Sequence, residues 1–299
     1  MIKVANAPCS WGVLEFELEG EAADCSQVLD EMQQTGYGGT ELGDWGFMPT
    51  DPTQLADILG ERQLQLLGAF VPVALADSNT HAVGQETAIR TASLMRDAGF
   101  PDAFIVLADD NGTVLDRTKN AGRILPEHGL PVEQWQTFSS GADDLAKAVK
   151  DSAGLRTVFH HHCGGYVETP REIQTLLDQT QPDLLGLVLD VGHLTFAGGD
   201  PLAALTQWQD RIWHIHYKDC HPGIARRSRE QHWDYFESVK QGVFCKLGDG
   251  EVDFPAITER LCDQFSGDWI VVEQDVLPGM GDPKVCAQHN REYLKSLGL

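Results

Sequence analysis

Strand-like and helix-like segments alternate along the whole chain, and this alternation limits the folds that it can adopt. Short apolar runs predict strands at 2–7, 36–43, 66–75, 103–108, 157–162, 184–190, 212–218 and 269–274. Helix-prone stretches separate them, the first at about 22–34 and the last ending near 296. This order predicts an α/β fold in which helices connect the strands of a parallel sheet.

Length and uniform composition favour a closed barrel for that sheet. A (β/α)8 TIM barrel typically has about 250 residues, and this chain has 299, of which 42% are hydrophobic. We find no shift in composition along the chain, so we expect a single TIM-barrel domain over residues 1–299. A doubly wound open sheet is the alternative, which is disfavoured because no GxGxxG motif follows the first strand.

Local signals mark helix starts and one unusual connection. Thr169 and Glu172 match a capping box with Pro170 at the first helical position. Asp200 followed by proline predicts the start of the next helix in the same way. The connection over residues 220–253 is longer than an ordinary loop after a barrel strand. Loops of that length in compact domains are often lids or binding elements.

The charge balance excludes several classes of partner. The chain has 22 basic and 45 acidic residues, which gives a net charge of −23. Such a surface repels phosphate backbones and anionic membranes, so we expect neither nucleic acid nor membrane as a partner. Seven scattered cysteines without a CxxC pair indicate reduced thiols. Because the first residues lack a signal-peptide pattern and no window resembles a transmembrane span, we expect a cytoplasmic protein.

Segments in the C-terminal half end in residue types that bind metals. They read FHHH (159–162), LVLDVGH (187–193), HIHYKD (214–219) and VVEQD (271–275). A parallel barrel brings the C-terminal ends of its strands to one rim, where such enzymes have their chemistry. The sequence therefore predicts one divalent-metal site built from His160, Asp190, His216 and Glu273. Two imidazoles and two carboxylates suit Mn²⁺ or Co²⁺, with Zn²⁺ or Fe²⁺ as alternatives, better than Mg²⁺ or Ca²⁺.

Polar residues near these ends extend the candidate site. His214, His216 and Lys218 share one face of their strand, and a polar face in a barrel interior is unfavourable unless it serves a site. Asp190 and His193 are three residues apart, where a strand is expected to give way to a loop. His193 could therefore bind the metal or support a ligand. The alternative is that Asp190 only caps a helix.

Candidates also lie in the N-terminal part of the chain. Glu41 ends the second predicted strand and could be a general base, a binder of a substrate hydroxyl or a member of a buried ion pair. Asn6 and Trp11 follow the first strand and could form the floor and wall of a polyol site. Trp11 could equally belong to the core. For Glu273, the alternative to metal binding is an ion pair with Lys218 or an arginine.

Several segments together resemble a known family. They read APCSWG, GYGGTELG, HHHCGGYVETPREI, LVLDVGHLTFAGGDP, RIWHIHYKD and LGDGEVDF. They are similar to the inosose dehydratases, which belong to the xylose-isomerase-like TIM-barrel superfamily. DVGH and HIHxKD recur throughout that superfamily, whereas residues 166–172 and 190–201 are more specific. The superfamily usually places Glu, Asp, His and Glu around its metal. In this sequence His160 replaces the first carboxylate, and His162 could serve instead.

The resemblance implies a reaction. Scyllo-inosose, a keto-polyol of myo-inositol catabolism, would lose water to give a trihydroxycyclohexane dione. Glu41 or His162 would remove the α-proton, and Lys218 or His193 would protonate the leaving hydroxyl. The alternatives are a ketose epimerase or isomerase, a non-catalytic polyol-binding protein and an endonuclease, the last opposed by the net charge of −23. Residues 242–249 would order over the site or form a subunit contact in a homo-oligomer.

Overall fold

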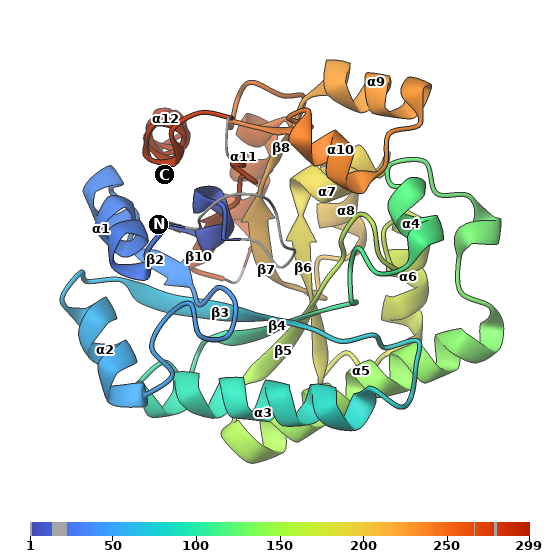
Figure 1. Cartoon of the computed structure of the whole chain (residues 1–299), viewed down its shortest axis with the longest axis horizontal. Coiled ribbons are helices and arrows are strands. Elements are labelled where there is room, and N and C mark those ends of the chain that lie inside the picture. Colours follow the sequence, from blue (N-terminus) through green and yellow to red (C-terminus); the bar gives the residue numbers. More distant parts are fainter. Residues whose placement is uncertain (1, 14–22, 266, 278–279) are drawn as a thin grey trace.

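A closed barrel of eight parallel strands forms the centre of the computed structural model, which describes residues 2–13, 23–265, 267–277 and 280–299 (Figure 1). The strands follow one another around the barrel in the order β1-β10-β7-β6-β5-β4-β3-β2. Their bounds are β1 Lys3–Asn6, β2 Gly39–Glu41, β3 Gln65–Pro72, β4 Phe104–Ala108, β5 Arg156–His160, β6 Leu185–Asp190, β7 Ile212–Tyr217 and β10 Trp269–Val272. The predicted TIM barrel is confirmed, and the open sheet is excluded.

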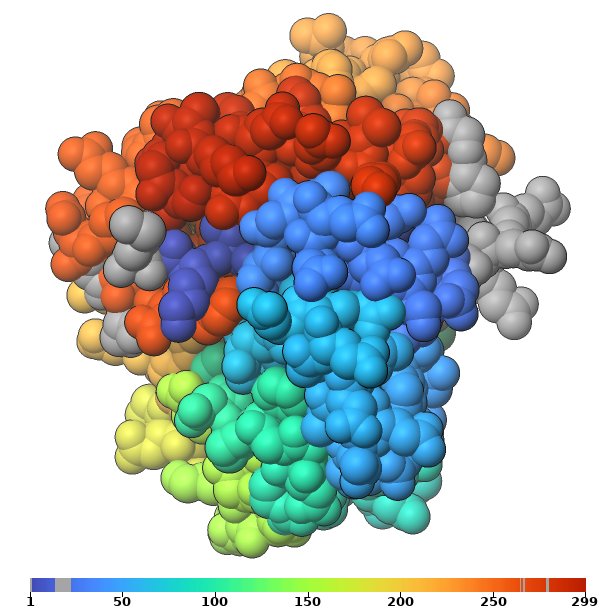
Figure 2. All heavy atoms as spheres, turned by 90° about the vertical axis from the view of Figure 1, so that its left-hand side faces the viewer, coloured from blue at the N-terminus to red at the C-terminus, as the bar shows by residue number. Residues whose placement is uncertain are grey.

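Helices surround the barrel (Figure 1). Their bounds are α1 Cys25–Thr35, α2 Pro52–Gly60, α3 His81–Asp97, α4 Leu115–Lys119, α5 Val132–Ala153, α6 Pro170–Gln179, α7 Val191–Phe196, α8 Pro201–Gln207, α9 Pro222–Gln231, α10 Tyr235–Lys240, α11 Phe254–Gln264 and α12 Pro283–Ser296, with 3-10 turns η1 Pro8–Trp11 and η2 Pro126–His128. The predicted first helical residue, Ala22, lies outside the described residues. Helix α12 packs along α1 (Figure 2). No described helix has both the length and the apolar character needed to cross a membrane.

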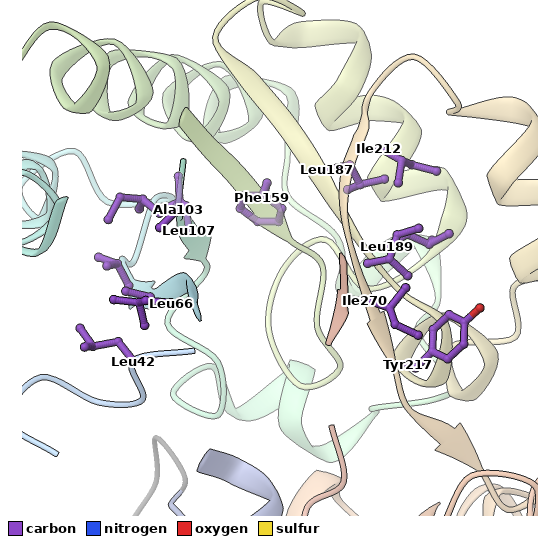
Figure 3. Close-up of a cluster of buried hydrophobic side chains, with 14 of the residues drawn as sticks. Leu42, Leu66, Ala103, Leu107, Phe159, Leu187, Leu189, Ile212, Tyr217 and Ile270 are labelled. Atoms are coloured by element: carbon purple, nitrogen blue, oxygen red, sulfur yellow. The ribbon is translucent and has the colours of Figure 1, made fainter. Parts of the chain in front are cut away.

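Alternate residues of each strand face opposite sides of the barrel wall. Leu187 and Leu189 of β6 face the helices and pack in the main core near Ile212 and Ile270 (Figure 3). The intervening residues face the barrel interior, where a second apolar cluster consists of Phe104, Val106, Val158 and Val188. Burying each such side chain stabilises the fold by about 1.5–3 kcal/mol. The interior cluster therefore gives the polar rim an apolar floor.

Several strands end earlier than the sequence predicts. Strand β5 ends at His160 and β10 at Val272, each two residues before the predicted end. The chain turns at the rim, and regular pairing stops there. The amide of Glu273 still donates to the carbonyl oxygen of Tyr217 at 3.0 Å, so this residue is held by a last ladder bond. Strand β6 runs directly into α7 instead of the expected loop.

The long connection at 220–253, which we call the cap segment, lies on the rim beside β7. It contains α9 and α10, and its strand β9 (Phe244–Cys245) pairs with β8 (Asp219–Cys220). Apolar residues of the cap segment, including Tyr235 and Phe244, pack against Cys163 in the loop after β5 and Phe196 at the end of α7. Gly164 leaves room for this contact, because a Cβ there would lie 3.1 Å from Cγ of Tyr235.

Asp219 holds both ends of the cap segment. Its carboxylate accepts hydrogen bonds from the backbone amides of Cys220, Gly248, Gly250 and Val252, at distances between 2.8 and 3.2 Å. A Cβ at Gly250 would lie 2.1 Å from Oδ1 of Asp219, so a side chain cannot be accommodated at this position. The glycine at position 250 is therefore required for the loop that returns the chain to α11.

Candidate metal centre

The predicted ligands converge at the C-terminal end of the barrel. His160, Asp190, His216 and Glu273 each place one ligand atom within 4.8 Å of the others. Nε2 of His160 is 3.1 Å from Nδ1 of His216, which is 3.3 Å from Oε1 of Glu273. Oδ2 of Asp190 is 3.7 Å from Nε2 of His160. Such a buried mixture of imidazoles and carboxylates is consistent with a divalent-metal site.

Each carboxylate of this cluster has one oxygen held by another group of the protein. Oδ1 of Asp190 accepts a hydrogen bond from the amide of His193 at 2.8 Å, at the first turn of α7. Oδ2 is buried without a hydrogen-bond partner among the described residues. Oε2 of Glu273 lies 3.3 Å from Nζ of Lys218, and Oε1 faces His216. Asp190 thus caps a helix and contributes to the cluster, two roles that the sequence analysis treats as alternatives.

Glu41 lies beside His216 instead of standing free in the cavity. Its Oε1 accepts hydrogen bonds from Nε2 of His214 at 2.8 Å and Nε2 of His216 at 3.1 Å. Burial alone would raise the pKa of Glu41, but the charge of His216 and these hydrogen bonds lower it to about 2. The predicted inward direction of His214 and His216 is confirmed. Because Nε2 donates to Glu41, Nδ1 is the ring nitrogen that faces the cluster, and a metal bound there would take the place of its proton.

Lys218 lies between two carboxylates. Its Nζ is 3.1 and 3.2 Å from the oxygens of Asp275 and 3.3 Å from Glu273. Burial lowers the pKa of Lys218, but Asp275 and Glu273 raise it well above its usual value, so the side chain is an ammonium ion. Asp275 is a site residue that was not predicted from the sequence. Its spacing of two from Glu273 is the signal, because such residues share one side of an extended chain.

The consecutive histidines have different surroundings. Nε2 of His161 accepts a hydrogen bond from the amide of Asp190 at 3.2 Å, in place of a ladder carbonyl. Nδ1 of His162 donates to the carbonyl oxygen of Cys163 at 2.7 Å, so its Nε2 carries a lone pair. The hydroxyl of Tyr235 is 3.4 Å from that nitrogen. The cluster therefore includes His160, while His162 lies beside it.

His193 is buried below the cap segment. Its Nδ1 accepts a hydrogen bond from the amide of Cys163 at 3.3 Å, and its ring centroid is 4.6 Å from that of Phe244. Burial, followed by the neighbouring His162 and Lys218, lowers the pKa of His193 well below its usual value. Its imidazole is therefore neutral. The described residues that line the cavity do not include it.

A cavity of about 60 Å³ adjoins the cluster. The strand ends and the residues directly after them contribute His160, Lys218 and Glu273 to its wall, and the cap segment contributes Tyr235 from α10. Asp44 lines it from the loop after β2. Strands contribute Glu41, Phe70 and His160, and most of the other lining residues lie in the loops that follow the strands. Tyr235 is a contribution that strand periodicity cannot indicate.

The residues predicted to contact a polyol ring lie elsewhere. Trp11 is buried in the main core, and its indole N–H donates to Glu31 at 2.8 Å. Oδ1 of Asn6 accepts hydrogen bonds from the amide of Ala7 at 2.9 Å and the hydroxyl of Ser10 at 2.6 Å. The described lining of the cavity includes neither Asn6 nor Trp11. The structure therefore places Trp11 as in the alternative reading, in the core.

Known proteins resemble the chain along almost its whole length. Residues 29–297 match the model of the family described as xylose isomerase-like TIM barrel. The rhizopine catabolism protein MocC of Rhizobium meliloti is 33% identical over 98% of this chain and 87% of its own. An inosose dehydratase of Lacticaseibacillus casei is 29% identical over 98% and 96%. The structure of L-ribulose 3-epimerase superposes with a TM-score of 0.71 at 16% identity, covering 99% and 94%.

Fold and site together define a class of protein. A closed parallel barrel with buried His, Asp and Glu side chains at its C-terminal rim is the architecture of a sugar-processing barrel enzyme. The match over residues 29–297 is more specific. The chain belongs to the xylose isomerase-like TIM barrel family.

Proposed function

We propose that this enzyme is a metal-dependent dehydratase that eliminates water from a keto-inositol, scyllo-inosose. Relatives named inosose dehydratase match 98% of the chain at 29% identity, which supports this reaction class. The observation that carries the proposal is one cavity in which a metal-ligand cluster adjoins a lysine ammonium group and the imidazole of His162, whose pKa burial lowers well below its usual value. A dehydratase requires these parts: a charge stabiliser, a proton donor and a proton acceptor.

The charge of the cavity favours an uncharged substrate. Carboxylates of Glu41, Asp44, Glu273 and Asp275 line it, and Lys218 is a cation already paired with two of them. A phosphorylated sugar would bring its negative charge among these groups without a free cation in the described lining. A keto-polyol offers hydroxyl donors that the carboxylates can accept. We therefore expect an unphosphorylated keto-polyol as the substrate.

The side chains divide the proton transfers between them. When bound by His160, Asp190, His216 and Glu273, a metal such as Mn²⁺ or Co²⁺ supplies Lewis-acid stabilisation for the charge that develops on the ketone oxygen. His162 accepts the α-proton at Nε2, because its Nδ1–H is committed to Cys163. In the substrate, a C–H bond and a C–O bond break and a C=C bond forms.

Lys218 supplies the other proton. Its ammonium group donates to the β-hydroxyl as the C–O bond breaks, and water leaves. His162 then releases its proton to solvent and Lys218 regains one, so the cycle balances. His193 is less suited to this role because it lies outside the described cavity wall. Glu41 is less suited to act as base because two imidazoles donate to its Oε1.

The test uses metal-stripped protein and scyllo-inosose. Mn²⁺ or Co²⁺ is added back, and the absorbance of the enolised dione is followed. We expect this absorbance to increase only when the metal is present. In a Lys218→Met variant that still binds the metal, the absorbance should increase much more slowly. If wild-type protein binds the metal tightly but the absorbance does not increase, scyllo-inosose is rejected as the substrate.

The same reaction in deuterated water separates a dehydratase from an epimerase. Both remove an α-proton, but an epimerase returns a proton to carbon instead of losing hydroxide. Nuclear magnetic resonance would then show deuterium in the recovered ketose and its epimer, without dione. That outcome would assign the cavity to epimerisation.

A further inference from the structure

Glu41 makes an unusual contact across the barrel interior. It ends β2, whereas its partners His214 and His216 belong to β7, and β1 and β10 separate these strands in the barrel. Oε1 of Glu41 accepts from Nε2 of both imidazoles, at 2.8 and 3.1 Å. All of these side chains are buried, with exposed fractions of 1% to 6%. The contact is therefore shielded from bulk solvent, which strengthens hydrogen bonds to charged groups.

The neighbouring backbone is shaped for this contact. The register between β2 and β3 shifts between Thr40 and Glu41, and such a bulge redirects the side chain that follows it. Gly68 of β3 adds space, because a Cβ there would lie 3.2 Å from Oε1 of Glu41 and 3.0 Å from Val106. The bulge and the glycine together direct the Glu41 carboxylate towards β7.

We propose that Glu41 is a positioning residue that fixes His216 for metal binding, with His214 holding the carboxylate from the strand position below. The hydrogen bond to Glu41 places the His216 proton on Nε2. It therefore leaves Nδ1, which faces Asp190 and Glu273, as the nitrogen that would bind the metal in place of a proton. An imidazole held in this way is also a more basic ligand. The inference rests on the metal site of the proposed function and is independent of its substrate.

This role makes a different prediction from that of a general base. A base acts on the substrate after the metal has bound, so its loss leaves metal affinity unchanged and cannot be corrected by more metal. A positioning residue acts through its ligand, so its loss weakens metal binding. Outer carboxylate partners of this kind typically change metal affinity by about 10–100-fold.

The experiment compares Glu41→Gln with wild type. Calorimetry gives the affinity of each metal-stripped protein for Mn²⁺, and the visible absorption of bound Co²⁺ reports the geometry of the ligands. We expect Mn²⁺ affinity to fall by about 10–100-fold, with a changed Co²⁺ spectrum. Turnover of scyllo-inosose should recover largely when Mn²⁺ is saturating. The matched control is Asp44→Asn, which removes a carboxylate from the same cavity wall and should bind Mn²⁺ like wild type.

The outcomes separate the two ideas. Unchanged Mn²⁺ affinity in Glu41→Gln, or turnover that stays lost at saturating metal, would overturn the positioning role. Equal losses in Asp44→Asn would also overturn it, because they would reflect cavity charge alone. If Glu41→Gln does not fold, His214→Met tests the same chain of contacts and should weaken Mn²⁺ binding to a smaller extent. If wild type binds Mn²⁺ but leaves scyllo-inosose unchanged, only the proposed function fails, and the affinities still decide this inference.

Discussion

The metal-ligand cluster and the cap segment meet at the same cavity but are built differently. The cluster takes His160, Asp190 and His216 from the ends of neighbouring strands, where His160 pairs with Val188 and His216 pairs with Asp190 and Val271. The cap segment contributes Tyr235 from a short helix that rests on an apolar contact with barrel loops. Ligand atoms thus depend on the sheet, whereas part of the substrate wall depends on an added layer. The two regions should respond separately to substitution.

The largest effect should follow from loss of a ligand. Asp190→Asn removes a charge from the cluster, and we expect the turnover number to fall by about 10⁴-fold, which corresponds to about 5 kcal/mol. Added Mn²⁺ should no longer raise the melting temperature. Asp200→Asn is the matched control, because Asp200 also caps a helix but lies outside the cluster. A melting temperature of Asp190→Asn that still rises with Mn²⁺ would contradict the assignment.

A buried ion pair supports the loops on which the cap segment rests. Arg117 donates to both oxygens of Glu172, at 2.8 and 3.0 Å, and to the carbonyl of Gly165 at 2.7 Å. Arg117→Met leaves Glu172 without its cation and should lower the free energy of unfolding by about 3–5 kcal/mol in urea titrations. The exposed pair of Lys147 and Asp151 gives the control, because Lys147→Met should change it by less than about 1 kcal/mol. Similar losses in both variants would show that burial is not decisive.

Glu168 should make these loops sensitive to pH. Burial raises its pKa from 4.5 to about 7, although Arg117 and the amides of Gly164 and Gly122 partly oppose this. A carboxyl whose pKa is higher in the folded state stabilises the fold below pH 4.5, and this contribution is lost as pH rises through about 7. The free energy of unfolding should therefore fall over this range by up to about 3 kcal/mol relative to Glu168→Gln. Parallel pH curves for the two proteins would refute the shift.

The smallest effect should come from the cap segment side of the cavity. Tyr235→Phe removes a hydroxyl near His162, and we expect kcat/KM to fall by about 10-fold, or about 1.4 kcal/mol, with unchanged Mn²⁺ affinity. Tyr217→Phe is the control, because that buried hydroxyl bonds to Thr258 at 2.9 Å, away from the cavity. Reduced Mn²⁺ affinity in Tyr235→Phe would show that the two regions are not separate.

The fold could be predicted because its signals are local. Short apolar runs mark the strands, and the capping box at Thr169 and Glu172 and the cap at Asp200 are present as expected. Strand ends were less predictable, because pairing at the rim depends on where the neighbouring chain turns. The helix that directly follows Asp190 was not predicted either. Asp190 ends β6, and its side chain also caps the first turn of α7.

The part of the site that could be predicted is the part built from strand ends, because a barrel brings these ends to one rim. Four strand ends on one rim are sufficient to bring His160, Asp190, His216 and Glu273 together. The direction of Glu41 depends on a register shift, which no pattern in β2 reveals. Tyr235 depends on how the cap segment folds back, and that involves contacts between residues distant in sequence. The periodicity of apolar residues in a single segment does not predict such contacts.

Asp219 has a consequence for how the cap segment meets the barrel. One carboxylate joins the first amide of the cap segment to amides of the returning loop, so both ends are clasped at a single point. Because these amides meet at one carboxylate, the cap segment leaves the barrel and returns to it at a single place beside the end of β7. Asp219 thus closes the cap segment into one loop, which carries Tyr235 to the cavity.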